Sequence, residues 1–378
     1  MQVSALAFDD DLWATLIARL GGADALERSA RTHGALRRKR GIGSAEDLLR
    51  LILAYAPGGR SLRQLAAEAA AREISEISDV AWMKRFGGCG PWLMALADGL
   101  LARPGAAAAD GTSPPVRLVD GSRIEGPGDS ALRLHLCWDA SSRRIADLTV
   151  TALSEGERLD RLPLKAGEIR LADAGMPHAE ALRRAQAAGA DVLVRLTWSS
   201  LRLLDEANRP LDWLALCAKS HAEGGLDLPV QVVKPRGRFE PLPMRLVIRP
   251  KPPEVLEAAR KRARRAASKE QRKVDPRTLA CAEHLILITS LTPQDFPPER
   301  LVELYRVRWQ IELAFKRLKS ILRLDRLPAR SPGLAQAWVA AHLLLALLIE
   351  DTAAELADSF PSAADHTRPG KPRPLALA

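Results

Sequence analysis

The chain has 378 residues, of which 47% are hydrophobic, and its formal net charge is +10. This length allows two or three domains, and the apolar content supports a packed core and excludes wholesale disorder. The positive charge favours a polyanionic partner, either nucleic acid or an anionic membrane surface. Charge alone leaves the choice between these two partners open.

The sequence predicts a cytoplasmic protein, associated with the nucleoid if its partner is DNA. The segment Met1 to Leu12 has three aspartates and no basic start before an apolar run, so we do not expect a signal peptide. The apolar stretch Trp338 to Ile349 is interrupted by His342 and is too short to span a bilayer. The four cysteines lie far apart in the sequence, at Cys89, Cys137, Cys217 and Cys281. We therefore expect isolated, buried thiols, and neither a zinc site nor a disulfide framework.

Residues 1–108 are expected to form a helical N-terminal domain that binds DNA. Ser44 can cap a helix that runs to Tyr55, and Ser61 can open a second helix over Leu62–Ala71. A third helix is expected over Asp79–Phe86. Short helices joined by Gly-rich turns suit a helix-turn-helix-like unit, preceded by a basic run of Arg37, Arg38, Lys39 and Arg40. A plain helical bundle with a solvated basic turn fits the pattern equally well.

After an Ala-, Gly- and Pro-rich linker at 104–115, residues 116–196 change to an α/β pattern. Alternating Leu132, Leu134 and Leu136 predict a half-buried strand. A helix is expected over His178–Ala188, between Pro177 and Gly189. The order β-β-β-β-α-β is typical of a mixed, five-stranded α/β sheet of the RNase H type, with strands over Val116–Val119, Leu132–Trp138, Arg144–Leu153, Ile169–Ala172 and Asp191–Leu196.

Residues 197–291 are expected to be a mostly β insertion with a basic arm. Its predicted strands are Pro229–Val233, Met244–Ile248 and His284–Thr289. The arm has eight basic residues and the single acid Glu270: Arg260, Lys261, Arg262, Arg264, Arg265, Lys269, Arg272 and Lys273. Such a run of charges is often only exposed to solvent, but in a protein that holds DNA it would contact phosphates.

Residues 292–358 are expected to complete the core with helices, and residues 359–378 to be a disordered tail. One long helix begins at Pro298, and a second, apolar helix over Leu334–Leu356 should pack beneath it.

Two aspartates come at the predicted ends of strands. Asp120 stands in Val119-Asp120-Gly121-Ser122, and Asp173 stands in Ala172-Asp173-Ala174-Gly175. Strand ends are rigid, and small neighbours let a metal ion and a phosphate backbone approach closely. By itself, however, an aspartate before glycine is more often turn chemistry.

The predicted helix after Pro298 carries a more informative set of side chains. Tyr305, Arg308, Glu312 and Lys319 fall on one stripe of that helix, which borders its apolar face. An internal ladder of Glu–Arg and Glu–Lys ion pairs is the simplest alternative interpretation. The spacing Tyr-x2-Arg-x3-Glu-x6-Lys, however, resembles the signature of insertion-sequence-4 family DDE transposases at all four positions. The two aspartate boxes, and Gly156-Glu157 ahead of the second box, also resemble that family and stand in the same order.

The resemblance implies an RNase H-like domain in which Asp120, Asp173 and Glu312 hold two Mg²⁺ ions, which Mn²⁺ could replace. Oxygen-only ligands agree with these metals and not with zinc. The implied activity is cleavage at transposon ends and strand transfer into target DNA by a cut-and-paste route. Tyr305, Arg308 and Lys319 would then bind DNA phosphates, and the active form would be a homodimer that holds two inverted-repeat ends.

The sequence departs from the family at one place. The family often has a tryptophan in the last strand of the insertion, beside a flipped base. Here His284 stands near that position, so it is the candidate for stacking on DNA, and the hairpin route is in doubt. Two other functions stay open: a catalytically inactive, transposase-derived DNA-binding protein, and an RNase H-type nuclease that acts on RNA.

Overall fold

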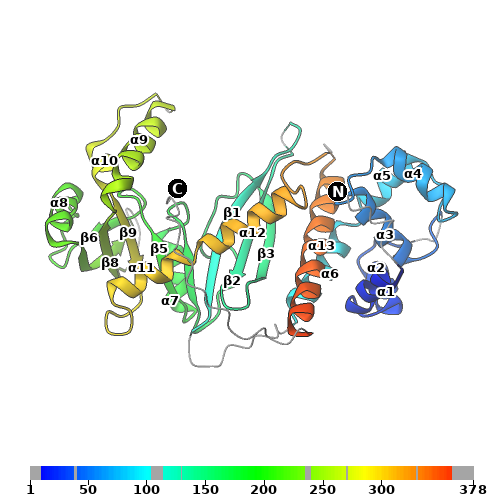
Figure 1. Cartoon of the computed structure of the whole chain (residues 1–378), viewed down its shortest axis with the longest axis horizontal. Helices are drawn as coiled ribbons and strands as arrows, with labels where there is room; N and C mark the ends of the chain where they lie inside the picture. Colours follow the sequence, from blue (N-terminus) through cyan, green and yellow to red (C-terminus); the bar gives the residue numbers. More distant parts are fainter. Residues whose placement is uncertain are drawn as a thin grey trace.

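The computed structural model describes residues 10–37, 41–103, 114–128, 130–234, 240–269, 271–328 and 331–359, with side chains as far as 353. The basic residues 38–40, most of the expected linker and the expected tail from 360 onward lie outside this part of the chain. The described fold is mixed α/β and elongated, with a large sheet in the middle and helices at one end (Figure 1).

The N-terminal region is helical, as predicted. Ser44, Ser61 and Ser78 each accept a hydrogen bond from the first turn of the helix that they precede, which fixes the starts of three helices. All three match the helices expected from the sequence. Within the described residues of this region the helices are α1 (Asp10–Arg19), α2 (Ala23–Thr32), α3 (Ala45–Tyr55), α4 (Leu62–Ala71), α5 (Asp79–Phe86) and α6 (Gly90–Leu101).

In the part of the chain that the structure describes, the sheet has nine strands in the order β3-β2-β1-β4-β5-β9-β8-β7-β6. β1 pairs in parallel with β4, and β4 with β5, whereas all other neighbours are antiparallel. The five predicted strands are present, but the sheet does not stop at them, because the strands of the insertion extend it at the edge of β5. The strands are β1 (Val116–Ile124), β2 (Leu132–Asp139), β3 (Arg144–Ala152), β4 (Ile169–Ala172), β5 (Asp191–Arg195), β6 (Arg202–Leu204), β7 (Leu226–Val233), β8 (Leu242–Pro250) and β9 (His284–Thr289).

Helices cover both faces of the sheet. Leu118 and Leu171 on one face belong to the same apolar core as α11 (Pro298–Arg306) and α12 (Trp309–Ser320). Val119 and Ala172 on the other face pack with α7 (Ala179–Ala187). The half-buried alternation expected for β2 is therefore wrong, because every residue from Leu134 to Trp138 is buried.

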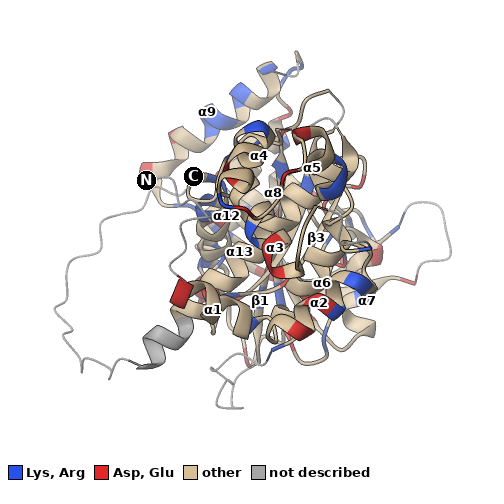
Figure 2. Ribbon diagram, turned by 90° about the vertical axis from the view of Figure 1, so that its right-hand side faces the viewer, with Lys and Arg blue, Asp and Glu red and all other residues tan. Residues whose placement is uncertain are grey.

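The insertion is not mostly β, as the sequence had suggested. Three helices hold more of its residues than its four strands do, namely α8 (Trp213–Glu223), α9 (Pro253–Lys269) and α10 (Pro276–Ala282). The basic run forms most of α9, which projects from the body of the protein (Figure 1), and Lys and Arg positions recur along its ribbon (Figure 2). Because α8 packs on α10, the Sγ atoms of Cys217 and Cys281 lie 3.7 Å apart. Both thiols are free and buried, as expected, but they are not isolated from each other.

The long helix expected from Pro298 is interrupted. α11 ends at Arg306 and α12 begins at Trp309, because the backbone N–H groups of Val307 and Arg308 donate to carbonyls three residues back and tighten the chain into a turn.

The last helix, α13 (Pro332–Ser359), also differs from expectation. It packs mainly on α6, with further contacts to α3 and α5, and not beneath α12.

α13 joins the N-terminal helices to the sheet. Over Pro332–Ala353 it is long and apolar enough to cross a membrane by length and composition, but 78% of its apolar window is buried inside the protein, as in a core helix. Asp351 near its end accepts hydrogen bonds from Arg19 of α1 (3.1 Å), Arg103 after α6 (3.2 Å) and Arg144 of β3 (2.6 Å). One buried carboxylate therefore links three separate segments of the chain.

Replacing Asp351 by Ala should lower the free energy of unfolding by about 3 kcal/mol, because three arginines lose their shared acceptor. Burial tends to raise the pKa of Asp351, but the hydrogen bonds from Arg144 and Arg19 outweigh it and lower that pKa. The stabilisation should therefore be complete above the unfolded pKa and decline as the pH falls below about 4. Urea unfolding at several pH values measures both effects. Equal stability of Asp351→Ala and the exposed-site control Glu206→Ala at pH 7 would show that the cluster contributes nothing.

Candidate active site

Asp120 and Asp173 lie side by side on the face of the sheet that α12 covers. Leu118 of β1 and Leu171 of β4 are register partners, and each aspartate stands two residues further along its strand direction. Side chains two residues apart share a face of a strand, so both carboxylates point to the same side. The sequence predicted that β1 would end at Asp120. The strand instead runs on to Ile124, and Asp120 lies in the middle of β1, where it pairs with Leu136 of β2. Asp173 directly follows β4, as predicted.

The guanidinium group of Arg308 joins the three predicted carboxylates. Its Nη1 lies 3.4 Å from Oδ2 of Asp120, and its Nη2 lies 3.9 Å from Oδ2 of Asp173. Nη2 also donates a hydrogen bond to Oε1 of Glu312, one helical turn further on. Arg308 stands at the turn between α11 and α12, so this turn aims its side chain at both strands.

Tyr305 fixes the position of Asp173 from the last turn of α11. Its hydroxyl donates to Oδ1 of Asp173 (3.3 Å) and lies 3.5 Å from the carbonyl oxygen of Ala172. Burial, followed by the charge of Asp173, raises the pKa of Tyr305, so the phenol keeps its proton and acts as a donor. The side chain is 8% exposed, which agrees with a packed aromatic residue that orients a carboxylate.

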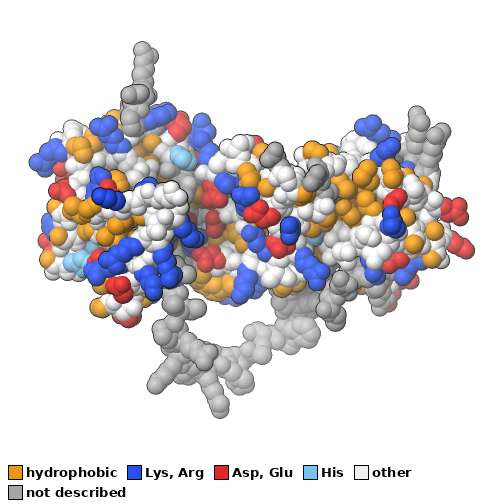
Figure 3. All heavy atoms as spheres, turned by 90° about the horizontal axis from the view of Figure 1, so that it is seen from above, with side chains coloured by type: hydrophobic (Ala, Val, Ile, Leu, Met, Phe, Trp, Pro, Cys, Tyr) orange, Lys and Arg blue, Asp and Glu red, His pale blue; other side chains and the backbone are white. Residues whose placement is uncertain are grey.

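The three carboxylates differ in their surroundings. Burial raises the pKa of Asp120 to about 6, although a hydrogen bond from the N–H of Gly121 and the charge of Arg308 both lower it. Glu312, in contrast, has a side chain that is 56% exposed. The site therefore has a buried floor at the sheet and an open side at α12. Seen from above, acidic side chains gather near the middle of the molecule, with many Lys and Arg side chains over the left-hand lobe (Figure 3).

A fourth carboxylate, Glu157, reaches the same region from the loop between β3 and β4. A Cβ added to Gly121 would lie 2.8 Å from its Cγ, and one added to Gly175 would lie 3.4 Å from its Oε2. Its Oε1 pairs with Arg133 of β2 at 3.6 Å. The glycine that follows Asp120 is therefore needed for the close approach of Glu157.

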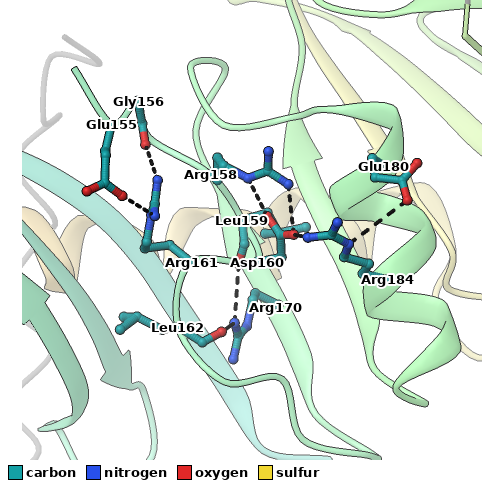
Figure 4. A network of polar contacts seen from close by, with 10 residues as sticks. All are labelled: Glu155, Gly156, Arg158, Leu159, Asp160, Arg161, Leu162, Arg170, Glu180 and Arg184. Atoms are coloured by element: carbon teal, nitrogen blue, oxygen red, sulfur yellow. Dashed lines mark hydrogen bonds and ion pairs between the residues drawn. The ribbon is translucent and has the colours of Figure 1, made fainter. Parts of the chain in front are cut away.

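Hydrogen bonds and ion pairs hold this loop in place against the sheet and α7 (Figure 4). Arg170, which is 1% exposed, donates to the carbonyl oxygens of Leu159 (3.2 Å) and Leu162 (2.9 Å). Asp160 accepts from Arg158 and from Arg184 of α7 at 2.9 Å. The backbone on the C-terminal side of Glu157 is thus tied to β4 and α7.

Two predicted site residues lie away from the carboxylates. Lys319 is half-buried near the end of α12, about 10 Å along the helix from Glu312. His284 is 4% exposed, its Nδ1 lies 2.9 Å from the carbonyl oxygen of Ala280, and its ring contacts His221. Stacking on a DNA base would require the His284 ring to break its contacts with Ala280 and His221.

Two other residues at the site were not expected from the sequence. Arg195 at the end of β5 forms an ion pair with Asp173 (2.7 Å), which only the pairing of β4 with β5 reveals. Trp309 stands next to Arg308 and is 56% exposed, an unusual state for so large an apolar side chain. The sequence signal for Trp309 was its place within the Tyr305–Lys319 motif.

The donor chemistry of the site fits a hard divalent cation. All three predicted carboxylates already turn an oxygen toward one positive centre, the Arg308 guanidinium. Within the described ranges, however, no three Asp, Glu, His or Cys side chains are grouped as ligands around one point. Metal binding would therefore require Arg308 to give up its contacts.

Comparisons with known proteins show the family of this chain. The sequence matches the family described as "Transposase DDE domain" over residues 111–349, a range that contains Asp120, Asp173 and Glu312. It is 38% identical over 352 residues to the putative transposase InsL for insertion sequence element IS186A of Escherichia coli strain K12, which covers 91% of this chain and 94% of that protein. The transposase for insertion sequence element IS421 of Escherichia coli is 38% identical over 353 residues, with the same coverage. The chain belongs to the DDE transposases, enzymes that cleave DNA strands and transfer them to new sites.

Proposed function

We propose that this transposase cuts at the ends of its own insertion sequence and joins them to target DNA by a cut-and-paste route, with Asp120, Asp173 and Glu312 as its metal-binding carboxylates. The observation that carries the proposal is that Arg308 contacts oxygens of all three, although they come from β1, the end of β4 and α12. We further place the chain in the insertion-sequence-4 group, on the basis of the spacing of Tyr305, Arg308, Glu312 and Lys319.

We also propose that the catalytic core is RNase H-like, in two parts at 116–196 and 292–358. The strand order β3-β2-β1-β4-β5 supports this assignment, with an antiparallel β3-β2-β1 meander and parallel β1, β4 and β5. The residues from 197 to 291 would then be an insertion that extends the sheet from β5.

Asp120, Asp173 and Glu312 would hold two Mg²⁺ ions, or Mn²⁺ in their place, because carboxylate oxygens are the ligands that these ions prefer. When bound, the ions would activate the attacking oxygen and stabilise the leaving oxygen of a phosphodiester. Asp120 and Asp173 are held rigidly by the sheet and by Tyr305, whereas the exposed Glu312 can adjust. Once released from the carboxylates, the planar guanidinium group of Arg308 would bind a DNA phosphate through two parallel hydrogen bonds.

DNA would extend from this site across the basic helix α9. Lys261, Arg265 and Lys269 recur every four residues and are exposed, so they form one stripe on the helix. Such a stripe suits a phosphate backbone and adds affinity without sequence selectivity. Lys319 would bind a further phosphate, and the exposed Trp309 could rest on a base.

The remaining features of the proposal concern assembly. The helices α3, α4 and α5 would form the helix-turn-helix-like unit of an N-terminal DNA-binding domain over residues 1–108, and a homodimer would bring two inverted-repeat ends together. The enzyme would act in the cytoplasm, on the nucleoid. The competing function is a catalytically inactive DNA-binding protein, which would bind ends tightly without cutting them in Mg²⁺ or Mn²⁺.

Replacement of the carboxylates tests the central assignment. Asp120→Ala, Asp173→Ala and Glu312→Ala should each reduce Mg²⁺-dependent cleavage of a DNA duplex carrying the element's end by at least about 1,000-fold, because each removes a metal ligand. Their end binding in Ca²⁺ should remain within about threefold of wild type in a gel-shift assay. Glu303→Ala, on the exposed side of α11, is the matched control and should cut normally. Normal cutting by any of the three variants would remove that residue from the site.

Glycine substitutions test the role of Glu157. Gly121→Ala should lower cleavage by roughly 10- to 100-fold, because the added Cβ displaces the Glu157 side chain at the site. Gly156→Ala should leave cleavage unchanged, since a Cβ there meets nothing within 4 Å. Rates measured under single-turnover conditions compare the two variants. Equal rates would show that the position of Glu157 does not matter for cutting.

Removal of the α9 stripe tests its interaction with DNA. The triple variant Lys261→Ala, Arg265→Ala, Lys269→Ala should bind DNA more weakly, and the slope of log affinity against log salt should fall by about 0.9 for each phosphate that the variant no longer neutralises. The charge-conserving triple variant Lys261→Arg, Arg265→Lys, Lys269→Arg serves as the control and should keep the wild-type slope. An unchanged slope in the alanine variant would mean that α9 is only a solvated helix.

A further inference from the structure

A group of four cysteine and histidine side chains lies in the insertion, apart from the carboxylate site. Cys217 and His221 are four residues apart on α8 and so share a face of that helix. Cys281 lies in the last turn of α10, and His284 begins β9. The two sulfur atoms are 3.7 Å apart, and the two imidazole rings meet edge to face with their centres 4.5 Å apart.

His284 is oriented as a ligand would be. It is 4% exposed, and its Nδ1 lies 2.9 Å from the carbonyl oxygen of Ala280, which fixes the ring. Its Nε2 is buried and makes no hydrogen bond of regular geometry, and the group that interacts with the ring there is the thiol of Cys217. Leaving such an atom without a regular hydrogen bond is unfavourable in a folded protein. A metal-binding histidine shows the same arrangement, with one ring nitrogen on a backbone carbonyl and the other free for the metal.

We propose that Cys217, His221, Cys281 and His284 bind one zinc ion. Two thiolates and two imidazoles are a usual ligand set for structural zinc. With Zn–S bonds of about 2.3 Å, two sulfurs of a tetrahedral site stand about 3.8 Å apart, which agrees with the observed separation. The oxygen-rich group around Arg308 would not compete for the same metal, because it favours harder cations.

His221 is the ligand that has to move. No three of the described donor side chains are yet grouped around a single point, and the His221 ring is turned so that its Nε2 lies 3.4 Å from Oε2 of Glu283. Its side chain is 41% exposed, so it is free to rotate toward the sulfurs. Glu283 can keep a hydrogen bond to the ring and orient it, as carboxylates do beside zinc-bound histidines.

The zinc ion would stabilise the part of the insertion on which the basic helix α9 rests. It would link α8 to α10 and to the start of β9, which follows α10 after the single residue Glu283. Glu283 also accepts a hydrogen bond from Arg260 of α9 (2.8 Å), so a fixed Glu283 restrains the first half of that helix. The site would therefore be structural, and α9 would be the element that depends on it.

Metal analysis of the full-length protein tests the proposal. After incubation with ZnCl₂ and dialysis against metal-free buffer, wild type should retain about one zinc ion per chain by mass spectrometry. The double variant Cys217→Ser, Cys281→Ser should retain little, whereas the control Cys89→Ser, Cys137→Ser, which removes the other two buried thiols, should keep the ion. Co²⁺ in place of Zn²⁺ should give the thiolate charge-transfer absorption of a tetrahedral site.

A variant at the exposed ligand His221 distinguishes a loss of zinc binding from a failure to fold. His221→Ala should fold as wild type by circular dichroism and bind zinc at least about tenfold more weakly. Three results would overturn the proposal: no retained zinc in wild type, zinc kept by the Cys217/Cys281 double variant, or a disulfide between these two cysteines in protein purified with zinc present. None of these results bears on the carboxylates, because DNA cleavage is not measured.

Discussion

The contacts of the Arg308 guanidinium are the interaction on which the rest of the site depends. Asp120, Asp173 and Glu312 come from positions 53 and 139 residues apart in the chain, and like charges so close together repel one another. One cation contacts all three and offsets that repulsion. The tight turn at Val307 and Arg308 is therefore structurally important, because a straight helix would not place Arg308 in the same way between two strands and the next helical turn.

The sheet provides the rigidity that such a cluster needs. β4 is buried along its whole length and β1 is buried at Leu118 and Val119, so the strands hold the two aspartates that follow in a fixed relation. The loop with Glu157 is fastened to the same strands through Arg170. The parts expected to meet DNA, namely Glu312, Trp309 and α9, are in contrast exposed. Rigid ligands on one side and adjustable contacts on the other are suited to binding a large, charged substrate.

Local signals in the sequence predicted local structure well. Ser44 and Ser61 cap the helices that they were expected to begin, and the apolar runs became strands in the expected order along the chain. The motif around Glu312 singled out Tyr305 and Arg308 as DNA contacts, and in the structure the two side chains contact Asp173 and Asp120. These inferences depend on spacing within one element or on a family signature, and both can be read from a single chain.

Features that depend on packing between distant elements could not be predicted. Nothing in the composition of α13 shows that it packs on α6 instead of α12, since an apolar helix can cover either surface. The partnership of Cys217 with Cys281 arises only when α8 meets α10, and the ion pair of Arg195 with Asp173 only when β4 pairs with β5. The interruption at Val307 was also missed, because neither Gly nor Pro marks it.

The most direct measurement is a crystal structure of the enzyme with a transposon-end duplex and Mn²⁺, recorded to show anomalous scattering from the metal. The account predicts Mn²⁺ peaks between Asp120, Asp173 and Glu312, with the Arg308 guanidinium displaced from the carboxylates onto a DNA phosphate. Anomalous peaks elsewhere, or an Arg308 that still bridges the three carboxylates while DNA and Mn²⁺ are bound, would contradict it.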